Sequence, residues 1–139
     1  MANVIRFGVS LEAELLGKFD SLIKERGYKS RSEAIRDLIR GQLVSEEWRE
    51  KKKETVGILG LVYNHEERGL AKTLTRLQHK HLDLIISSTH IHLDKHNCLE
   101  VIVLKGKSYL IKNISDELLS TGSVKHGKLI MTTTGKDID

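Results

Sequence analysis

Hydrophobic positions divide the chain into two segments with different periodicities. Apolar and polar or small residues alternate over 5–9, which is the period-two pattern of a strand with one buried face. Apolar residues then recur at helical spacing over 15–23 and again over 34–43, with Gly27 between the two runs. The pattern predicts a strand followed by two helices in residues 1–50.

Local signals place the starts of both helices. Ser10 stands where its side chain would cap the first helix, and acidic residues follow it in the first turn. Ser30 and Glu33 have the spacing of a capping box, which predicts the start of the second helix.

This first segment is too small to be stable alone. One strand cannot pair with itself, and two short amphipathic helices bury little surface. A twofold dimer with paired strands solves both problems, and its ribbon would present Arg6, Gly8 and Ser10 at a width that enters a DNA major groove. The alternative is that residues 1–10 form an edge strand of a larger sheet.

The second segment, 55–134, alternates strands and helices. A charged stretch, Lys51-Lys52-Lys53-Glu54, precedes it and is interpreted as a solvated polar linker. The order β-α-β-β-α-β is that of the ferredoxin-like fold, so the chain is assigned to the α+β class. The expected strands cover 56–63, 84–93, 98–104 and 128–133, and the expected helices centre on 70–77 and 111–119.

Composition excludes or disfavours a few classes of protein. The chain has 139 residues, a net charge of +4 and a single cysteine, so an intramolecular disulfide is excluded. Its low aromatic content, 4%, disfavours a platform for stacking single-stranded nucleic acid. No apolar run approaches a membrane span and no secretory signal opens the chain, so a soluble cytoplasmic protein without membrane contact is expected.

Histidines and the cysteine form a candidate metal site in one hairpin. If the turn centres on Lys95, His92 lies opposite Cys98 and His90 opposite Glu100, and opposed residues share a face of the sheet. Two imidazoles, a thiolate and a carboxylate then converge. The alternate residues are apolar and are expected to pack on the domain's own helices, which would turn the metal face away from the core. A fourth ligand would then come from a neighbouring subunit. The apolar residues are Ile91, Leu93, Leu99, Val101 and Val103.

The donor set leaves the fourth ligand and the metal open. His79 and His81, near the end of the preceding helix, are both candidates. Three imidazoles and a thiolate suit Zn²⁺ in a tetrahedral site and Ni²⁺ or Cu²⁺ in a planar one. Glu100 is expected to hydrogen bond a ligand. The competing interpretation is that the histidines are ordinary surface residues and Cys98 a small buried hydrophobe.

The same residues resemble those of the NikR family of nickel-responsive transcriptional regulators over nearly the whole chain. The family spacing H-x13-H-x10-H-x-H-x5-C is met by His65, His79, His90, His92 and Cys98. The stretch over 26–37 also resembles the family's helix-turn-helix junction. The resemblance implies an N-terminal ribbon-helix-helix domain (1–50), a C-terminal ACT-like domain (55–134) and a homotetramer built as a dimer of dimers.

The resemblance also implies roles for particular residues. His90, His92 and Cys98 of one chain and His79 of another would form a planar Ni²⁺ site, one per subunit. Secondary metal coordination is implied for His65, with His81 as a further candidate. The surrounding hydrogen bonds would come from Tyr63 and Glu100, and K⁺ would be held by Glu33 and Asp37. The DNA contacts would come from Arg6, Gly8, Ser10, Ser30, Arg31 and Arg68.

Two departures from the family pattern bear on DNA. Gly8 cannot hydrogen bond a base edge, so Arg6 and Ser10 would carry direct readout. Where the family can have paired basic residues after the first histidine, this chain has Glu66 and Glu67 before Arg68.

The function expected is therefore a nickel-responsive regulator that binds double-stranded operator DNA and represses nickel-uptake genes. A metallohydrolase is disfavoured because four protein ligands leave no open position on the metal, so no enzymatic activity is expected. The other alternative is a metal-independent regulator that senses a small molecule such as an amino acid. Domains of the ACT type that bind amino acids commonly have a glycine-rich turn after the first strand, and Tyr63-Asn64-His65 contains no glycine.

Overall fold

The computed structural model describes residues 3–139 and separates into two compact units. The boundary falls between Ile39 and Arg40, inside a helix, so one helix contributes residues to both units. In the described residues, no helix combines the length and apolar character needed to cross a membrane.

Two helices form the regular secondary structure of the first unit's described residues: α1 (Ala13–Glu25) and the beginning of α2 (Arg31–Arg49). Gly27 follows α1 with a φ of +82°, as expected of a residue that ends a helix in the left-handed region. The predicted cap of α2 is confirmed, because Ser30 Oγ accepts a hydrogen bond of 3.2 Å from the Glu33 amide. The predicted Ser10 cap is wrong: α1 begins three residues later, and its N-cap residue makes no side-chain cap bond.

The strand predicted at 5–9 is absent from the described chain, where residues 3–12 contain neither helix nor strand. Ile5, Phe7 and Val9 are 84%, 69% and 61% exposed. The physical reason is that a β-strand needs a second strand for its backbone hydrogen bonds, and the first unit of a single chain provides none. The alternation predicted a strand, and the described residues of the single chain lack the second strand that the predicted dimer would supply.

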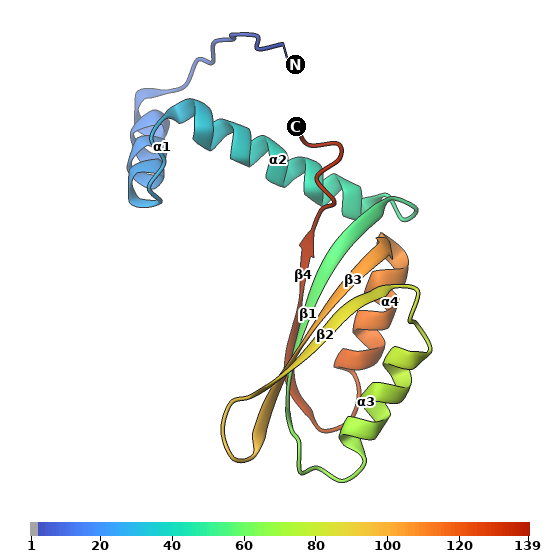
Figure 1. The fold of residues 1–139 in the computed structure, drawn as a ribbon. Helices are drawn as coiled ribbons and strands as arrows, with labels where there is room; N and C mark the ends of the chain where they lie inside the picture. Colours follow the sequence, from blue (N-terminus) through green and yellow to red (C-terminus); the bar gives the residue numbers. More distant parts are fainter. Residues whose placement is uncertain (1–2) are drawn as a thin grey trace. The chain divides into compact units, whose positions relative to one another are not determined.

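The second unit has the predicted order β-α-β-β-α-β (Figure 1). Its four strands form one antiparallel sheet in the order β2-β3-β1-β4. Helices α3 and α4 lie on the same side of this sheet (Figure 1). The elements are β1 (Glu54–Asn64), α3 (Leu70–His79), β2 (Ile85–His92), β3 (Asn97–Lys107), α4 (Ser108–Leu119) and β4 (Val124–Thr132).

The core lies between the sheet and its helices. Strand β1 alternates buried and half-buried residues along its length, as a strand with one helix-covered face must. Trp48 near the end of α2 joins this core, and its indole N–H donates a hydrogen bond of 2.8 Å to the Thr132 carbonyl. The buried sheet residues are Leu59, Leu61, Tyr63, Cys98, Ile102 and Leu104, and the buried helix residues include Leu70, Leu74, Leu77, Ile111, Ile114 and Leu118.

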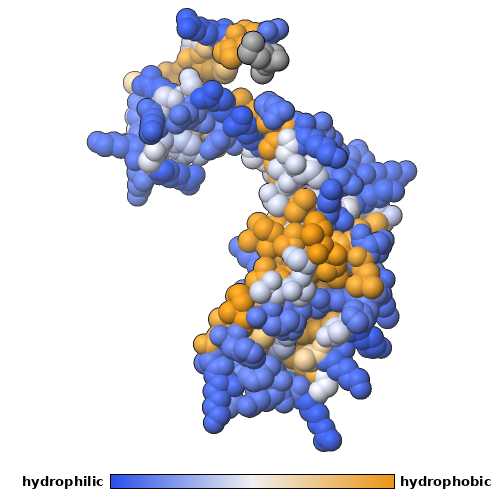
Figure 2. All heavy atoms as spheres, viewed as in Figure 1, coloured by the Kyte–Doolittle hydropathy of each residue, from blue (hydrophilic) through white to orange (hydrophobic). Residues whose placement is uncertain are grey.

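The opposite face of the sheet keeps apolar side chains partly accessible. Ile58, Val103 and Ile130 are neighbours across three strands, and Ile130 is 55% exposed. Hydrophobic side chains gather over the strands in the surface view (Figure 2). Burying such a face in a partner is favourable because it removes apolar surface from water.

The stretch interpreted as a solvated linker is exposed at Lys51, Lys52 and Glu54, and its backbone forms a fixed turn. Residues 51–53 form a turn between α2 and β1, and the Ser108 amide at the start of α4 donates a hydrogen bond of 3.0 Å to the Lys53 carbonyl. Composition indicated a charged surface there, but not that the backbone beneath it would be bound to another element.

Candidate metal centre

The hairpin of β2 and β3 has the register that the sequence predicted. His92 pairs with Cys98 and His90 with Glu100. The connecting turn is stabilised by Asp94, whose carboxylate accepts hydrogen bonds of 2.8 Å from the amides of His96 and Asn97. A hydrogen bond from the Asn97 side-chain amide, followed by these two backbone bonds, lowers the pKa of Asp94 to about 2. The turn chemistry therefore fixes which side chains oppose each other.

The predicted orientation of this site is wrong. Cys98 and Glu100 are 2% and 1% exposed and belong to the helix-covered face, whereas Ile91 and Leu93 are 42% and 51% exposed. The same face continues into Ile102 and Leu104, which pack against the helices. Alternation shows which residues share a face of the strand. Which of the two faces the helices cover depends on the apolar residues of all four strands.

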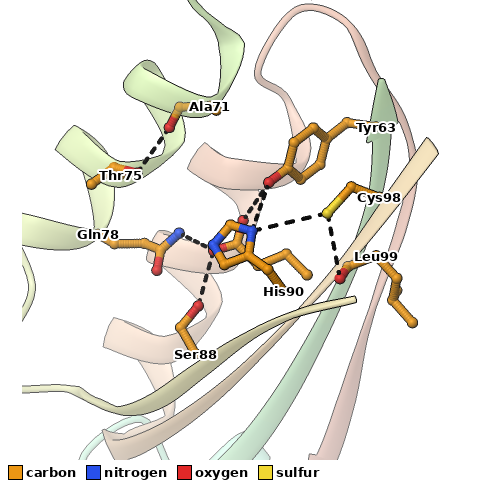
Figure 3. A network of polar contacts seen from close by, with 9 residues as sticks. Tyr63, Ala71, Thr75, Gln78, Ser88, His90, Cys98 and Leu99 are labelled. Carbon is orange, nitrogen blue, oxygen red and sulfur yellow. Dashed lines mark hydrogen bonds and ion pairs between the residues drawn. The ribbon is translucent and has the colours of Figure 1, made fainter. Parts of the chain in front are cut away.

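His90 lies at the centre of the candidate site (Figure 3). Its Nδ1 is 3.9 Å from the Cys98 sulfur and 3.3 Å from the Tyr63 hydroxyl. Its Nε2 is 3.3 Å from a carboxylate oxygen of Glu100. The imidazole side chain is half exposed while the carboxylate is buried, so the site opens at the edge strand β2.

Glu100 is the buried anchor of the hydrogen bonds around His90. Its carboxylate accepts bonds from Gln78 Nε2 at 2.7 Å, Ser88 Oγ at 2.9 Å and the Tyr63 hydroxyl at 3.2 Å. Three donors satisfy the oxygens of a carboxyl group that burial would otherwise penalise. Burial, followed by the charge of Glu100, raises the pKa of Tyr63 far above its usual value, so this hydroxyl stays protonated and donates.

His92 pairs with His65 rather than with the residues around Glu100. The two rings are 5.4 Å apart in an edge-to-face arrangement. Nδ1 of His65 lies 2.9 Å from the His96 carbonyl, which fixes this nitrogen as the protonated one. The other nitrogen of His65 then carries the lone pair that can bind a metal, which is a common arrangement for a metal-binding histidine.

The remaining candidate histidines lie at the end of α3. His79 is the last residue of this helix and is exposed, and His81 lies 3.6 Å from the carboxylate of Glu117 on α4. Within residues 3–139 of one chain, no three potential ligands are grouped closely enough to hold a metal ion. The thiol and imidazoles that do come together are soft or borderline donors, which fit a late divalent transition metal and not Mg²⁺ or Ca²⁺.

The predicted DNA and potassium residues lie elsewhere. Arg6, Gly8 and Ser10 are exposed in the irregular segment before α1, and Arg68 is exposed in the turn before α3. Arg31 makes two hydrogen bonds of 2.8 Å with the Asp20 carboxylate, an interaction that no sequence pattern indicated.

The two acidic residues expected to hold potassium each accept a hydrogen bond. Asp37 accepts one of 2.7 Å from the Tyr28 hydroxyl, and Glu33 accepts one of 3.4 Å from the Lys29 amide. Glu33 also belongs to the confirmed cap of α2, so its structural role does not depend on an ion.

Two residues of the site, Gln78 and Ser88, were not predicted from the sequence. Ser88 could have been found, because it lies two positions before His90 and so shares its face of the strand. Gln78 carried no comparable signal, since only the packing of α3 on the sheet brings its amide to Glu100.

Comparisons with known proteins cover both units. Residues 56–132 match the family described as "NikR C terminal nickel binding domain", and residues 5–46 match "Ribbon-helix-helix protein, copG family". Proteins from Pyrococcus furiosus and Geobacter sulfurreducens, each named "Putative nickel-responsive regulator", are 56% and 55% identical to this chain. The alignments cover 98% and 99% of this chain and 99% of each relative.

A solved structure shares part of the fold at low sequence identity. The uncharacterized protein TM1266 from Thermotoga maritima matches 55% of this chain and 95% of its own, with a TM-score of 0.50 and 18% identity. This likeness concerns the fold alone.

Proposed function

The chain belongs to the NikR family of nickel-responsive transcriptional regulators, and we propose that it represses nickel-uptake genes by binding operator DNA when loaded with Ni²⁺. Family membership establishes a regulator with a ribbon-helix-helix DNA-binding domain and a nickel-binding domain, not an enzyme. The operator, the repressor role and a cytoplasmic location are parts of the proposal.

We assign the Ni²⁺ ligands to two chains. His90, His92 and Cys98 of one subunit and His79 of another would hold the ion, one per subunit. The observation that supports this most directly is the hairpin register, which sets His92 opposite Cys98 and brings His90 Nδ1 within 3.9 Å of the sulfur. When bound, the metal supplies a cross-link between subunits, because its donors come from both.

His65 and His81 keep secondary roles in this proposal. His65 stands beside His92 with one nitrogen already occupied, so it suits an alternative metal position. His81 is engaged with Glu117, which favours His79 as the ligand given to a neighbour.

A homotetramer, a dimer of dimers, is the assembly we propose. Two surfaces support it, and each is apolar and accessible in a single chain. The first consists of Ile5, Phe7 and Val9, whose backbone has no strand partner in the first unit. The second is the sheet face around Ile58, Val103 and Ile130. Pairing the first across a twofold axis and covering the second with another sheet would remove both from water.

DNA recognition is assigned to the ribbon formed by two chains. Arg6 and Ser10 would contact base edges in the major groove, while Gly8 permits close approach of the backbone. Phosphates would be bound by the start of α2 at Ser30 and Arg31 and by Arg68. Glu33 and Asp37 are proposed as oxygen donors for K⁺.

The chain's own residues explain how loading the site would change DNA binding. Gln78 ties the last turn of α3 to Glu100 on β3, and the next residue of that helix is His79. When His79 binds the metal of a neighbouring subunit, it therefore restrains α3, which Gln78 anchors to the candidate site of its own chain. Regulation then requires that the restrained assembly, and not the free one, favours the arrangement of ribbons that binds an operator.

The metal-independent alternative is not favoured. The nickel-binding family model covers 56–132, which is most of the second unit and includes every proposed ligand. A small-molecule regulator would have no use for the donor set in the hairpin.

A mobility-shift titration tests the proposal. Promoter fragments upstream of nickel-uptake genes are titrated with the full chain in Ni²⁺, Zn²⁺ or Cu²⁺, and after chelation. We expect retardation selective for Ni²⁺, lost in Cys98→Ala and kept in Lys72→Ala, an exposed position on α3. Unchanged nickel-dependent retardation by Cys98→Ala would refute the assigned site, and retardation independent of any metal would refute the function.

A further inference from the structure

The second unit carries a group of exposed lysines that no carboxylate of residues 3–139 neutralises. We define the lysine surface as Lys51, Lys52, Lys107 and Lys112, all exposed and absent from the ion pairs of the described chain. Nearby carboxylates are engaged by other cations: Glu54 by Lys105 and Lys136, and Glu46 by Arg49. Glu50 and Asp116 are exposed close by, and the surface stays positive with both counted.

The backbone beneath these lysines is fixed. The Ser108 and Tyr109 amides donate to the Lys53 and Lys51 carbonyls at 3.0 and 3.4 Å. Ser108 Oγ donates to the Glu50 carbonyl at 3.0 Å, and this serine is 1% exposed. The turn is therefore held against the start of α4, and Lys51 and Lys52 project from a rigid base.

Three elements bring the four side chains to the same end of the unit. Lys107 is the residue before α4 and pairs on the sheet with Glu54, just after the turn. Lys112 lies one helical turn beyond Ser108. It also lines a cavity of about 440 Å³ together with Arg49, whose charge is paired with Glu46.

From this arrangement we infer that the lysine surface binds the phosphate backbone of duplex DNA without reading its sequence. Lysine is a mobile point charge on a long stem, suited to phosphates at regular spacing and not to base recognition. Tyr109, between Lys107 and Lys112, is 39% exposed, but one ring does not provide the row of rings on which successive single-stranded bases stack. The inference rests on the proposed function, since α2 leads directly from the DNA-binding unit into the turn and so raises the local concentration of DNA.

The test measures binding of the full chain to a duplex that lacks any operator, with and without Ni²⁺, over a series of salt concentrations. The variant is Lys51→Gln, Lys52→Gln and Lys107→Gln combined. The slope of log K against log salt falls by about 0.9 for every phosphate that is no longer neutralised, so we expect a reduction of about 2.7. The matched control replaces three exposed lysines elsewhere, Lys72, Lys80 and Lys95, with Gln and should leave the slope within about 0.9 of the parent.

The outcomes separate the inference from the function on which it rests. An equal slope for the parent and the lysine-surface variant overturns the inference, even where nickel-dependent operator binding persists. Failure of the parent to bind plain duplex also overturns it. Displacement of DNA by poly-glutamate at equal charge concentration would show a surface for acidic protein instead. Nickel binding by all three proteins, followed by absorbance, should be equal, because none of the substitutions replaces a proposed ligand.

Discussion

Gln78 donates a hydrogen bond of 2.7 Å to the buried carboxylate of Glu100, and thereby joins the end of α3 to the middle of β3. The bond crosses between the helix that ends with His79 and the strand that carries Cys98. The bond therefore links His79, the ligand proposed for a neighbour's metal site, to the strand whose Cys98 is proposed for the chain's own site.

Removing this donor should destabilise the second unit. Gln78→Ala leaves one acceptor position of a buried carboxylate unsatisfied, and we expect the free energy of unfolding to fall by about 1–3 kcal/mol. Urea unfolding followed by circular dichroism measures the change. Lys72→Ala, on the exposed side of the same helix, should change it by less than about 0.5 kcal/mol. Equal effects of the two substitutions would show that the bond is unimportant.

Sharing of the metal site between chains can be tested by mixing two damaged subunits. His79→Ala and Cys98→Ala should each abolish tight nickel binding. Co-expressed, they should regain about a quarter of the sites, because an intact ligand set forms wherever each chain contributes its undamaged part. Nickel bound per tetramer gives the result.

The control for this mixture is co-expression of His90→Ala with Cys98→Ala. Both lesions fall in the set that one chain supplies, so no intact site can form and nickel binding should stay absent. Recovery in this control, or none in the first mixture, would contradict a site shared in the proposed way.

The Asp20–Arg31 ion pair predicts how stability of the first unit responds to acid. The hydrogen bond from Arg31 lowers the pKa of Asp20 below its ordinary value of 3.8. A depressed carboxyl pKa stabilises the folded chain above pH 3.8, and the stabilisation is lost as pH falls through the folded-state value. Titration of the Asp20 carboxyl carbon by NMR should show the low value, and Arg31→Gln should return it toward 3.8. An unaltered titration in Arg31→Gln would refute the pairing in solution.

Gly127 on β4 should not tolerate a side chain. A Cβ at this position would lie 2.3 Å from a methyl carbon of Leu119 and 2.9 Å from the Gly60 carbonyl oxygen. Overpacking of this kind costs about 1–3 kcal/mol, so Gly127→Ala should lower the thermal unfolding midpoint. Gly122→Ala is the matched control, because open space surrounds that position. A midpoint that moves equally in both variants would contradict the close packing.

Local chemistry in the sequence was sufficient for several features. Ser30 and Glu33 predicted the start of α2, and the polar turn after His92 predicted the register that opposes it to Cys98. The histidine and cysteine intervals predicted the family. The cap and the register depend on residues close together in the chain, and the histidine and cysteine intervals are themselves a property of residue order, so the sequence determines all of these features directly.

The tertiary structure decided which face of the hairpin is buried and what surrounds the site. Alternation predicted that Cys98 and Glu100 share a face, but the apolar character of Val101 and Val103 suggested the wrong face for the helices. Leu59 and Leu61 on β1 share the face of Cys98, and α3 and α4 pack there instead. Likewise, Ile5 to Val9 has the pattern of a strand but no partner within its unit. Pattern is a property of one segment, whereas burial and pairing depend on segments far apart or in another chain.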